Sequence, residues 1–431
     1  MSERNLNLLH PRDQIIMIIN RIYKKGLTTT SGGNISIMDD NGDMWVTPSG
    51  VDKGALKPSD IMCVKANGEI VGAHKPSMEY PFHKAIYVER PDIKSVVHAH
   101  PPALVAFSIV RQIPNTNVIP QVKRVCGPIG YAKYNIPGSS RLGDSISEQF
   151  KLGFDSVIME NHGAVVGGTD VIKAYERFET LEFSCRTLIN ARNIGTPCFL
   201  TEEQLDLFDE KIPVNFPQME TTTHPSDEKE IRLLIRDMVR RASDQGLMMS
   251  TYGTVSVRWK GNDFLITPTD ATRWDIQLDD IVQIKDGKCE KGKIPSRSTW
   301  MHQKIYEMHP SINAVIITQP ENLMAYGVTH RKLDVRTIPE SWIFLQDMEN
   351  VEFGSQFEGV MTIPSMISKE NPGVIIENDS VLMTGTSLLQ AFDRLEVAEF
   401  SAKSLVMGTS LGAFAPMGDD EIDELRVAFF S

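Results

Sequence analysis

The chain repeats itself once at an interval near 220 residues, and this repeat limits the possible folds more than any other feature. Five short stretches of the first half recur in the same order in the second: Gly33–Ile37 with Gly253–Val257, Val46–Ser49 with Ile266–Thr269, Pro76–Ser77 with Pro295–Ser296, His83–Tyr87 with His302–Tyr306, and Val157–Asn161 with Val374–Asn378. Such self-similarity indicates two copies of one structural unit. We predict one domain over residues 1–195, a linker rich in proline and threonine over 196–226, and a degenerate second copy over 227–431.

Each copy is predicted to mix helices and strands. Residues 11–24 carry apolar side chains at helical spacing. The strands at 35–37 and 44–47 flank an Asn41-Gly42 pair, which is typical of a hairpin turn. Further helices are predicted at 77–88 and 170–191, and further strands at 95–100 and 156–159. Because strands outnumber strand–helix–strand units, we expect an α/β fold with an antiparallel or mixed central sheet layered by helices.

Composition narrows the class of function. The formal net charge is −12 and the basic residues are not clustered, which argues against nucleic acid as a partner. The five cysteines include no C-x-x-C pair, so we expect neither a disulfide framework nor a thiolate zinc site, and a cytoplasmic protein. No apolar run approaches the length of about 18 residues that a membrane span needs, and the N-terminus lacks a signal-peptide pattern.

Three histidines of the first half form a candidate metal site. His98 and His100 are one residue apart in a predicted strand, so their side chains point to the same face. Taken alone, this pair is also compatible with a polar strand end. His162 follows another apolar strand, at a turn, and completes the three imidazoles of an open catalytic zinc site.

Glu79 joins these histidines because all four residues change together in the second copy. Taken alone, Glu79 fits an ordinary acid at the start of a helix capped by Ser77. The second copy replaces the four with Ser298, Ile317, Gln319 and Asp379, yet keeps the neighbouring residues that match His83, Tyr87, Pro91 and Pro101. We infer that the four residues act as one unit, present once per chain, although drift can imitate this at any single position.

Two polar turns are candidate anion-binding elements. Residues 31–34 form a glycine-rich turn before a strand, and residues 47–50 form a second turn, so both can present backbone N–H groups. In the second copy Asn34 becomes Thr254, and Gly50 becomes Asp270, whose carboxylate would repel an anion. Two ordinary β-turns explain the same residues equally well.

Read in order, the motifs G-N-x-S, T-P-S-G, P-S-x-E, H-x-H-P and N-H-G resemble the class II aldolase/adducin family, and within it the L-fuculose-phosphate aldolases. The similarity covers residues 10–195 well and residues 228–410 in weaker form. The resemblance implies a central mixed sheet layered by helices, and aldolases that are four-fold tetramers with active sites between subunits. For this chain it implies a homo-oligomer in which two chains make a pseudo-tetramer.

The resemblance also implies roles for individual residues. His98, His100 and His162 would bind zinc or another divalent ion, and Glu79 would be both a fourth ligand and the catalytic acid/base. The phosphate of a substrate would be held by Asn34, Ser49, Gly50 and Ser77. Two departures bear on the substrate: Met78 replaces the second serine of the family's P-S-S-E pattern, and residues 112–120 lack the tyrosine that the fuculose enzyme supplies across its interface.

The predicted activity is a metal-dependent retro-aldol cleavage of a ketose or ketose phosphate through an enediolate. The metal would act as a Lewis acid, and Glu79 would move the proton. The same fold also hosts epimerases, dehydratases and decarboxylases, so the reaction does not follow from the fold. A further alternative is a non-catalytic binding protein, as in the adducin branch, and the second copy fits that description.

Overall fold

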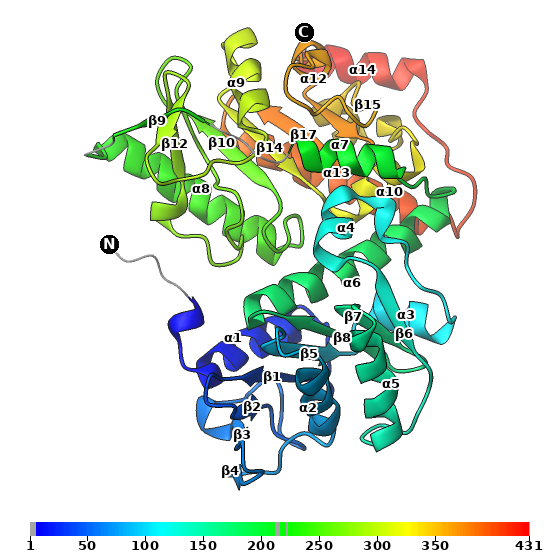
Figure 1. Ribbon diagram of the computed structural model, residues 1–431. Coiled ribbons are helices and arrows are strands. Elements are labelled where there is room, and N and C mark those ends of the chain that lie inside the picture. The colour runs from blue at the N-terminus through cyan, green and yellow to red at the C-terminus, as the bar shows by residue number, and fades with distance from the viewer. Residues whose placement is uncertain (1–5, 212–215, 221–222, 431) are drawn as a thin grey trace. The chain divides into compact units, whose positions relative to one another are not determined.

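The computed structural model describes residues 6–211, 216–220 and 223–430. The chain divides into two compact units, Met1–Thr116 with Gln121–Arg186, and Asn117–Pro120 with Thr187–Ser431. Each unit has its own sheet and its own covering helices (Figure 1). The boundary falls within the long helix α6 (Val171–Ile194), which was predicted at 170–191.

The first unit contains an eight-stranded sheet in the order β4-β3-β2-β1-β5-β8-β7-β6. Its strands are β1 (Asn34–Met38), β2 (Met44–Val46), β3 (Met62–Val64), β4 (Ile70–Val71), β5 (Ser95–Ala99), β6 (Ile129–Ala132), β7 (Ser156–Met159) and β8 (Gly163–Gly168). Only β6 and β7 are parallel, so the expected mixed sheet is confirmed. At its centre, β1 and β5 place Asn34 directly opposite His98.

Helices cover this sheet, whose central strands β5 and β8 are buried on both faces. The helices are α1 (Pro11–Lys24), α2 (Tyr80–Glu89), α3 (Pro102–Ile109), α4 (Pro120–Cys126) and α5 (Ser140–Lys151). Leu142, Ile146 and Phe150 recur every four residues along α5, and this stripe joins Phe82 and Ile86 of α2 in one core cluster. Helix α1 has the predicted bounds because Pro11 begins it and its isoleucines form a continuous buried stripe.

Helix α2 begins later than the sequence predicted. We expected a helix over 77–88 capped by Ser77, whereas the helix starts at Tyr80 with Glu79 as its N-cap residue. The Ser77 backbone N–H donates to the Thr47 carbonyl at 3.1 Å, which holds Ser77 in an extended pairing outside the helix. The Ser77 hydroxyl accepts instead from the Glu79 N–H at 3.3 Å, so it braces the turn that carries Glu79.

The second unit repeats this topology and adds one strand. Its order is β15-β16-β17-β14-β10-β11-β12-β13-β9, in which the first eight match the first sheet from β6 to β4. The strands are β9 (Gln218–Met219), β10 (Thr254–Arg258), β11 (Phe264–Ile266), β12 (Val282–Lys285), β13 (Lys288–Glu290), β14 (Ala314–Thr318), β15 (Glu349–Val351), β16 (Gly373–Ile376) and β17 (Ser380–Gly385). Thr254 lies opposite Ile317, as Asn34 lies opposite His98. The sequence repeat is therefore a repeat of strand order and register.

Part of the segment predicted as a linker forms a helix. Helix α7 (Glu202–Glu210) starts with a capping box between Thr201 and Gln204, and it buries Leu205 and Phe208. The other helices of this unit are α8 (Ser226–Asp244), α9 (Thr299–Met308), α10 (Glu321–Thr329), α11 (Pro339–Leu345), α12 (Thr362–Met366), α13 (Leu388–Gly408) and α14 (Asp419–Phe430). Among the described residues, none of the helices combines the length and apolar character that crossing a membrane requires.

In both copies a buried glutamate caps the helix that follows the central strand. Glu182 accepts hydrogen bonds from the first N–H groups of α3 at 3.2 and 3.0 Å, and Glu399 does the same for α10 at 3.1 and 2.9 Å. A carboxylate at this place satisfies N–H groups that have no partner within the helix. In the first copy this contact fixes the chain directly after His100.

Candidate metal centre

The four candidate ligands of the first copy lie together at one end of the central strands. His98 lies on β5, His100 directly follows it, His162 lies in the turn between β7 and β8, and Glu79 precedes α2. One ligand nitrogen from each histidine lies within 4.8 Å of the others. The carboxylate of Glu79 places Oε2 at 3.2 Å from His98 Nε2 and Oε1 at 3.4 Å from His162 Nε2. Residues distant in the sequence thus converge as the sequence predicted for a shared site.

The turn that carries His162 depends on both of its neighbours. Asn161 has a φ of 54°, a left-handed conformation that asparagine tolerates better than most residues. A side chain at position 163 would place its Cβ at 2.6 Å from the Ala99 carbonyl oxygen and 2.9 Å from His100 Cδ2. Only glycine at this position lets the turn approach the end of β5 so closely.

The backbone of β8 fixes the orientation of the His98 imidazole. Its Nδ1 lies 2.9 Å from the carbonyl oxygen of Ala164, which can only accept, so Nδ1 carries the hydrogen. The Nε2 lone pair then faces the Glu79 carboxylate and His100 Nε2, which is 3.1 Å away. These groups repel one another unless they share a positive charge. Three imidazoles and a carboxylate, with one imidazole held by a backbone carbonyl, fit a divalent metal ion.

The local electrostatics favour the protonation states that bind metals. Burial and the neighbouring charge of His98 lower the pKa of His100 to about 3 and the pKa of His162 to about 4. Burial by itself would raise the pKa of Glu79, but the charges of His98 and His162 hold it well below its usual range. At neutral pH His100 and His162 are therefore neutral and the Glu79 carboxylate is ionised, which are the forms that bind a metal.

Asn34 was expected to hold a phosphate, but its amide faces Glu79. The side chain is 2% exposed, and its Nδ2 donates to Glu79 Oε2 at 2.8 Å. Its Oδ1 bonds to the Nε2 of His83. Both ends of the amide are thus engaged inside the protein.

The other three candidate phosphate residues lie along two neighbouring turns. The Ser49 N–H donates to the Lys75 carbonyl at 2.8 Å, so the turn at 47–50 runs beside the segment that holds Ser77. Ser77 is buried, Ser49 is half-buried and Gly50 is exposed, with a φ of 70°. Met78, between Ser77 and Glu79, is 73% exposed, so an apolar side chain stands at the edge of this region.

Lys53 supports the same turn, although it lies outside the motifs that predict the site. Its side chain is 2% exposed, and its Nζ donates to the Pro48 carbonyl at 2.8 Å and to the Val51 carbonyl at 3.3 Å. Its backbone N–H donates to Thr30, in the neighbouring turn. In the second copy Arg273 donates to the matching turn at 2.7 and 2.9 Å. A cation at the same place in both copies was the signal that could have revealed this residue.

The second copy fills the corresponding place with its own residues. Gln319 Nε2 donates to the Asp379 carbonyl oxygen at 3.1 Å. Arg297, at the position of Met78, places its guanidinium 3.4 Å from the Asp379 carboxylate and 3.9 Å from the ring centre of Phe208 on α7. Among the residues that the structure describes, no three potential metal ligands gather at this place.

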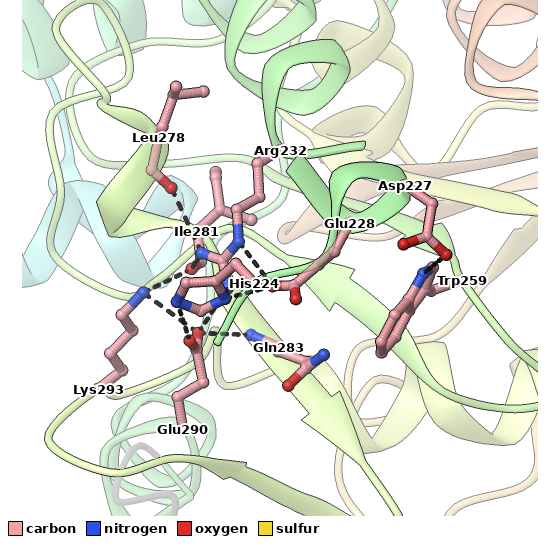
Figure 2. A network of polar contacts seen from close by, with 10 residues as sticks. All are labelled: His224, Asp227, Glu228, Arg232, Trp259, Leu278, Ile281, Gln283, Glu290 and Lys293. Carbon is pink, nitrogen blue, oxygen red and sulfur yellow. Dashed lines mark hydrogen bonds and ion pairs between the residues drawn. The ribbon is translucent and has the colours of Figure 1, made fainter. Parts of the chain in front are cut away.

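A different cluster in the second unit has ligand-like spacing but balanced charge. His224, Glu228 and Glu290 lie within 4.8 Å of one another (Figure 2). Arg232 donates to Glu228 at 2.6 Å and to Glu290 at 3.0 Å, and Lys293 lies 3.1 Å from Glu290. Two carboxylates already face two cations, so a divalent ion would add charge without compensation. We interpret the cluster as a structural network that joins α8 to β13.

Comparison with known protein families also finds one domain twice in this chain. The family described as Class II Aldolase and Adducin N-terminal domain matches residues 13–189 and again residues 234–406. The chain therefore belongs to this family and contains its domain twice. A solved structure of L-fuculose 1-phosphate aldolase is 28% identical to this chain. The match covers 49% of this chain and 97% of the aldolase chain, with a TM-score of 0.43.

Individual relatives carry different reaction names. 5-Deoxy-D-ribulose 1-phosphate aldolase of Bacillus thuringiensis is 30% identical over 199 residues, which is 45% of this chain and 92% of that protein. L-Fuculose phosphate aldolase of Methanococcus maripaludis is 36% identical over 169 residues, or 39% of this chain and 91% of that protein. 3-Oxo-tetronate 4-phosphate decarboxylase of Haemophilus influenzae is 31% identical over 179 residues, which is 40% of this chain and 84% of that protein. These likenesses support an enzyme, with aldolase and decarboxylase chemistry both represented.

Proposed function

We propose that the first copy is a divalent-metal-dependent aldolase, with zinc as the expected ion, that cleaves a ketose or ketose phosphate. The observation that carries this proposal is the convergence of His98, His100 and His162 on the carboxylate of Glu79. Three imidazoles with a carboxylate that can give way to substrate resemble an open catalytic site rather than a closed structural one. The two relatives named as sugar-phosphate aldolases support the same reaction.

His98, His100 and His162 would hold the metal ion, which when bound would supply Lewis-acid stabilisation of the negative charge that develops on substrate oxygen. Cleavage of the carbon–carbon bond leaves its electron pair on the carbon next to the ketone, and the departing hydroxyl-bearing carbon becomes an aldehyde as its hydroxyl loses a proton. The carbon that keeps the electron pair must take up a proton. Glu79 is the acid/base group of the cluster: its carboxylate takes the proton from the hydroxyl and then gives it to that carbon. The hydrogen bond from His98 to Ala164 keeps the imidazole oriented throughout.

A phosphorylated substrate would bind along the two turns beside the cluster. We assign the phosphate to Ser77, the Ser49 hydroxyl and the backbone of Gly50, since Ser77 and Ser49 belong to paired segments. Lys53 would support this site through its hydrogen bond to the Pro48 carbonyl in the turn. The proposed location is the cytoplasm, which suits five cysteines that are all free.

Replacing Glu79 tests the proposed chemistry directly. Glu79→Gln keeps the size of the side chain but removes the acid/base group, so we expect metal content to remain and ketose cleavage to fall by at least about 100-fold. Aldehyde release from a panel of ketoses and ketose phosphates measures the reaction, and elemental analysis measures the metal. Unchanged turnover in this variant would rule out the role of Glu79.

Decarboxylation is the second candidate, because the Haemophilus relative matches this chain at 31% identity, close to the two aldolases. It differs in its product: a 3-oxo acid phosphate would release carbon dioxide and no aldehyde. The same substrate panel, extended to such acids, separates the two reactions. Carbon dioxide release without aldehyde from any ketose would replace the aldolase proposal.

We also propose, from the family resemblance, that two chains assemble into a pseudo-tetramer. The family's aldolases form sites between subunits, and one chain here supplies two copies of the domain. Size-exclusion chromatography with light scattering should give twice the chain mass of 48.2 kDa. A stable monomer with full activity would contradict the assembly.

A further inference from the structure

A buried chain of hydrogen bonds ends on Glu79. The Tyr87 hydroxyl lies 2.6 Å from Ser36 Oγ, which lies 2.7 Å from Nδ1 of His83. Nε2 of His83 bonds to Oδ1 of Asn34, and Nδ2 of Asn34 donates to Glu79 Oε2 at 2.8 Å. All five residues are buried, and they come from β1, from α2 and from the residue that precedes α2.

Only one direction of donation satisfies every link. A carboxylate accepts, so Asn34 must turn Nδ2 toward Glu79 and Oδ1 toward His83. His83 must then donate from Nε2 and accept at Nδ1 from the hydroxyl of Ser36, which accepts in turn from Tyr87. This requires a neutral imidazole, and burial supports it by lowering the pKa of His83 to about 3.

The chain makes the two oxygens of the carboxylate different. Oε2 of Glu79 receives the hydrogen bond from Asn34 and lies 3.2 Å from His98. Oε1 is buried without a hydrogen-bond partner and has only the 3.4 Å contact with His162. One oxygen is therefore held in place, while the other remains available.

The second copy keeps the start of this chain and lacks its end. Ser256 Oγ lies 2.6 Å from Nδ1 of His302 and 2.7 Å from the Tyr306 hydroxyl, as in the first copy. In place of the asparagine stands Thr254, which bonds to Ser296 at 2.7 Å. Nε2 of His302 is buried without a hydrogen-bond partner. The last link thus occurs only in the copy that has the glutamate, which ties it to the site rather than to the fold.

We propose that Asn34 and His83 are positioning residues that hold Glu79 by Oε2, so that Oε1 is the oxygen that exchanges the proton with substrate. This inference rests on the proposed acid/base role of Glu79. It gives Asn34 a task toward the carboxylate in place of the phosphate contact that the family resemblance implied. A carboxylate held at one oxygen loses less rotational freedom when it reacts, which favours proton transfer.

Two variants of His83 test the proposal through kinetics. His83→Leu removes the donor to Asn34, whose amide can then rotate, and we expect kcat to fall about 10- to 100-fold with KM and metal content nearly unchanged. His83→Gln offers an N–H donor again and should recover part of the loss. The matched control is His302→Leu, which removes the same serine–histidine bond in the second copy and should leave kcat unchanged.

A spectroscopic measurement tests the chain without using activity. In protein labelled with ¹⁵N-histidine, the Nε2–H of His83 should exchange slowly with solvent, and Asn34→Ala should remove that protection. Rapid exchange in the unchanged protein would overturn the hydrogen-bond chain. This result does not depend on which reaction the enzyme catalyses.

The outcomes separate the two proposals. If Glu79→Gln is inactive while His83→Leu folds and retains full kcat, the positioning role is wrong and the proposed function stands. Equal losses of kcat in His83→Leu and His302→Leu would also overturn it, because both would then report on folding. If the protected Nε2–H is present but no ketose or ketose phosphate is cleaved, the proposed function fails and the chain remains.

Discussion

Strands β5 and β14 occupy the same place in the two sheets, but only β5 leads into candidate metal ligands. In the first copy, β5 pairs with β1 and leads into three imidazoles and a carboxylate. In the second copy, β14 pairs with β10 in the same register, but its matching residues are Ile317 and Gln319. The strand order survives the exchange of every candidate ligand, so the sheet does not need these residues for its own stability.

The two regions also differ in what covers them. Met78 beside the first site is 73% exposed, whereas its counterpart Arg297 stacks on Phe208 and faces Asp379. The half-buried guanidinium of Arg297 thus supplies positive charge where the first copy gathers metal-binding groups. The contact of an arginine with an aromatic face is itself stabilising. In the second region the side chains thus pair with one another, whereas in the first the same place holds the candidate metal ligands.

The largest expected difference between the two regions is in metal content. We expect about one divalent ion per chain in the unchanged protein, and none in His98→Ala/His100→Ala, because two of the three imidazoles are lost. Gln319→Ala, at the position that matches His100, should keep the full content. Elemental analysis measures the ions: two per chain, or none after reloading with zinc, would contradict a single metal site in the first copy.

Removing Phe208 should destabilise the second region and spare the first. The ring is 2% exposed and lies under the guanidinium of Arg297, so Phe208→Ala should lower the free energy of unfolding of this unit by about 3–5 kcal/mol. Denaturant unfolding measures the loss, and metal content serves as the control for the first copy. A decrease in the free energy of unfolding below about 1 kcal/mol would mean that the packing of α7 against Arg297 does not stabilise this region.

The two buried cations under the matching turns should be interchangeable. Lys53→Met leaves two carbonyl oxygens without their donor, so we expect a loss of about 1–3 kcal/mol in stability and a raised KM for a phosphorylated substrate. Lys53→Arg should be tolerated, because Arg273 performs this task in the second copy. Thermal melting and steady-state kinetics test both changes, and an unaffected Lys53→Met would show that the turn holds its shape unaided.

Local sequence patterns predicted much of the fold. The stripe of isoleucines in residues 11–24 predicted α1 with its observed bounds, and the Asn41-Gly42 pair predicted the turn between β1 and β2. In both cases the signal and the structure lie within a few residues of each other. The start of α2 was missed because a pairing with Thr47, 30 residues earlier, holds Ser77 outside the helix.

The repeat groups Glu79 with three histidines, since the second copy changes all four together. By contrast, the contacts that orient these residues join positions far apart, such as Asn34 to Glu79 and His98 to Ala164. The family, the doubled domain and the candidate ligands can be predicted from the sequence, because each rests on local motifs or on the repeat. Which amide faces the carboxylate and what fills the second site cannot, because strand register and burial set those contacts.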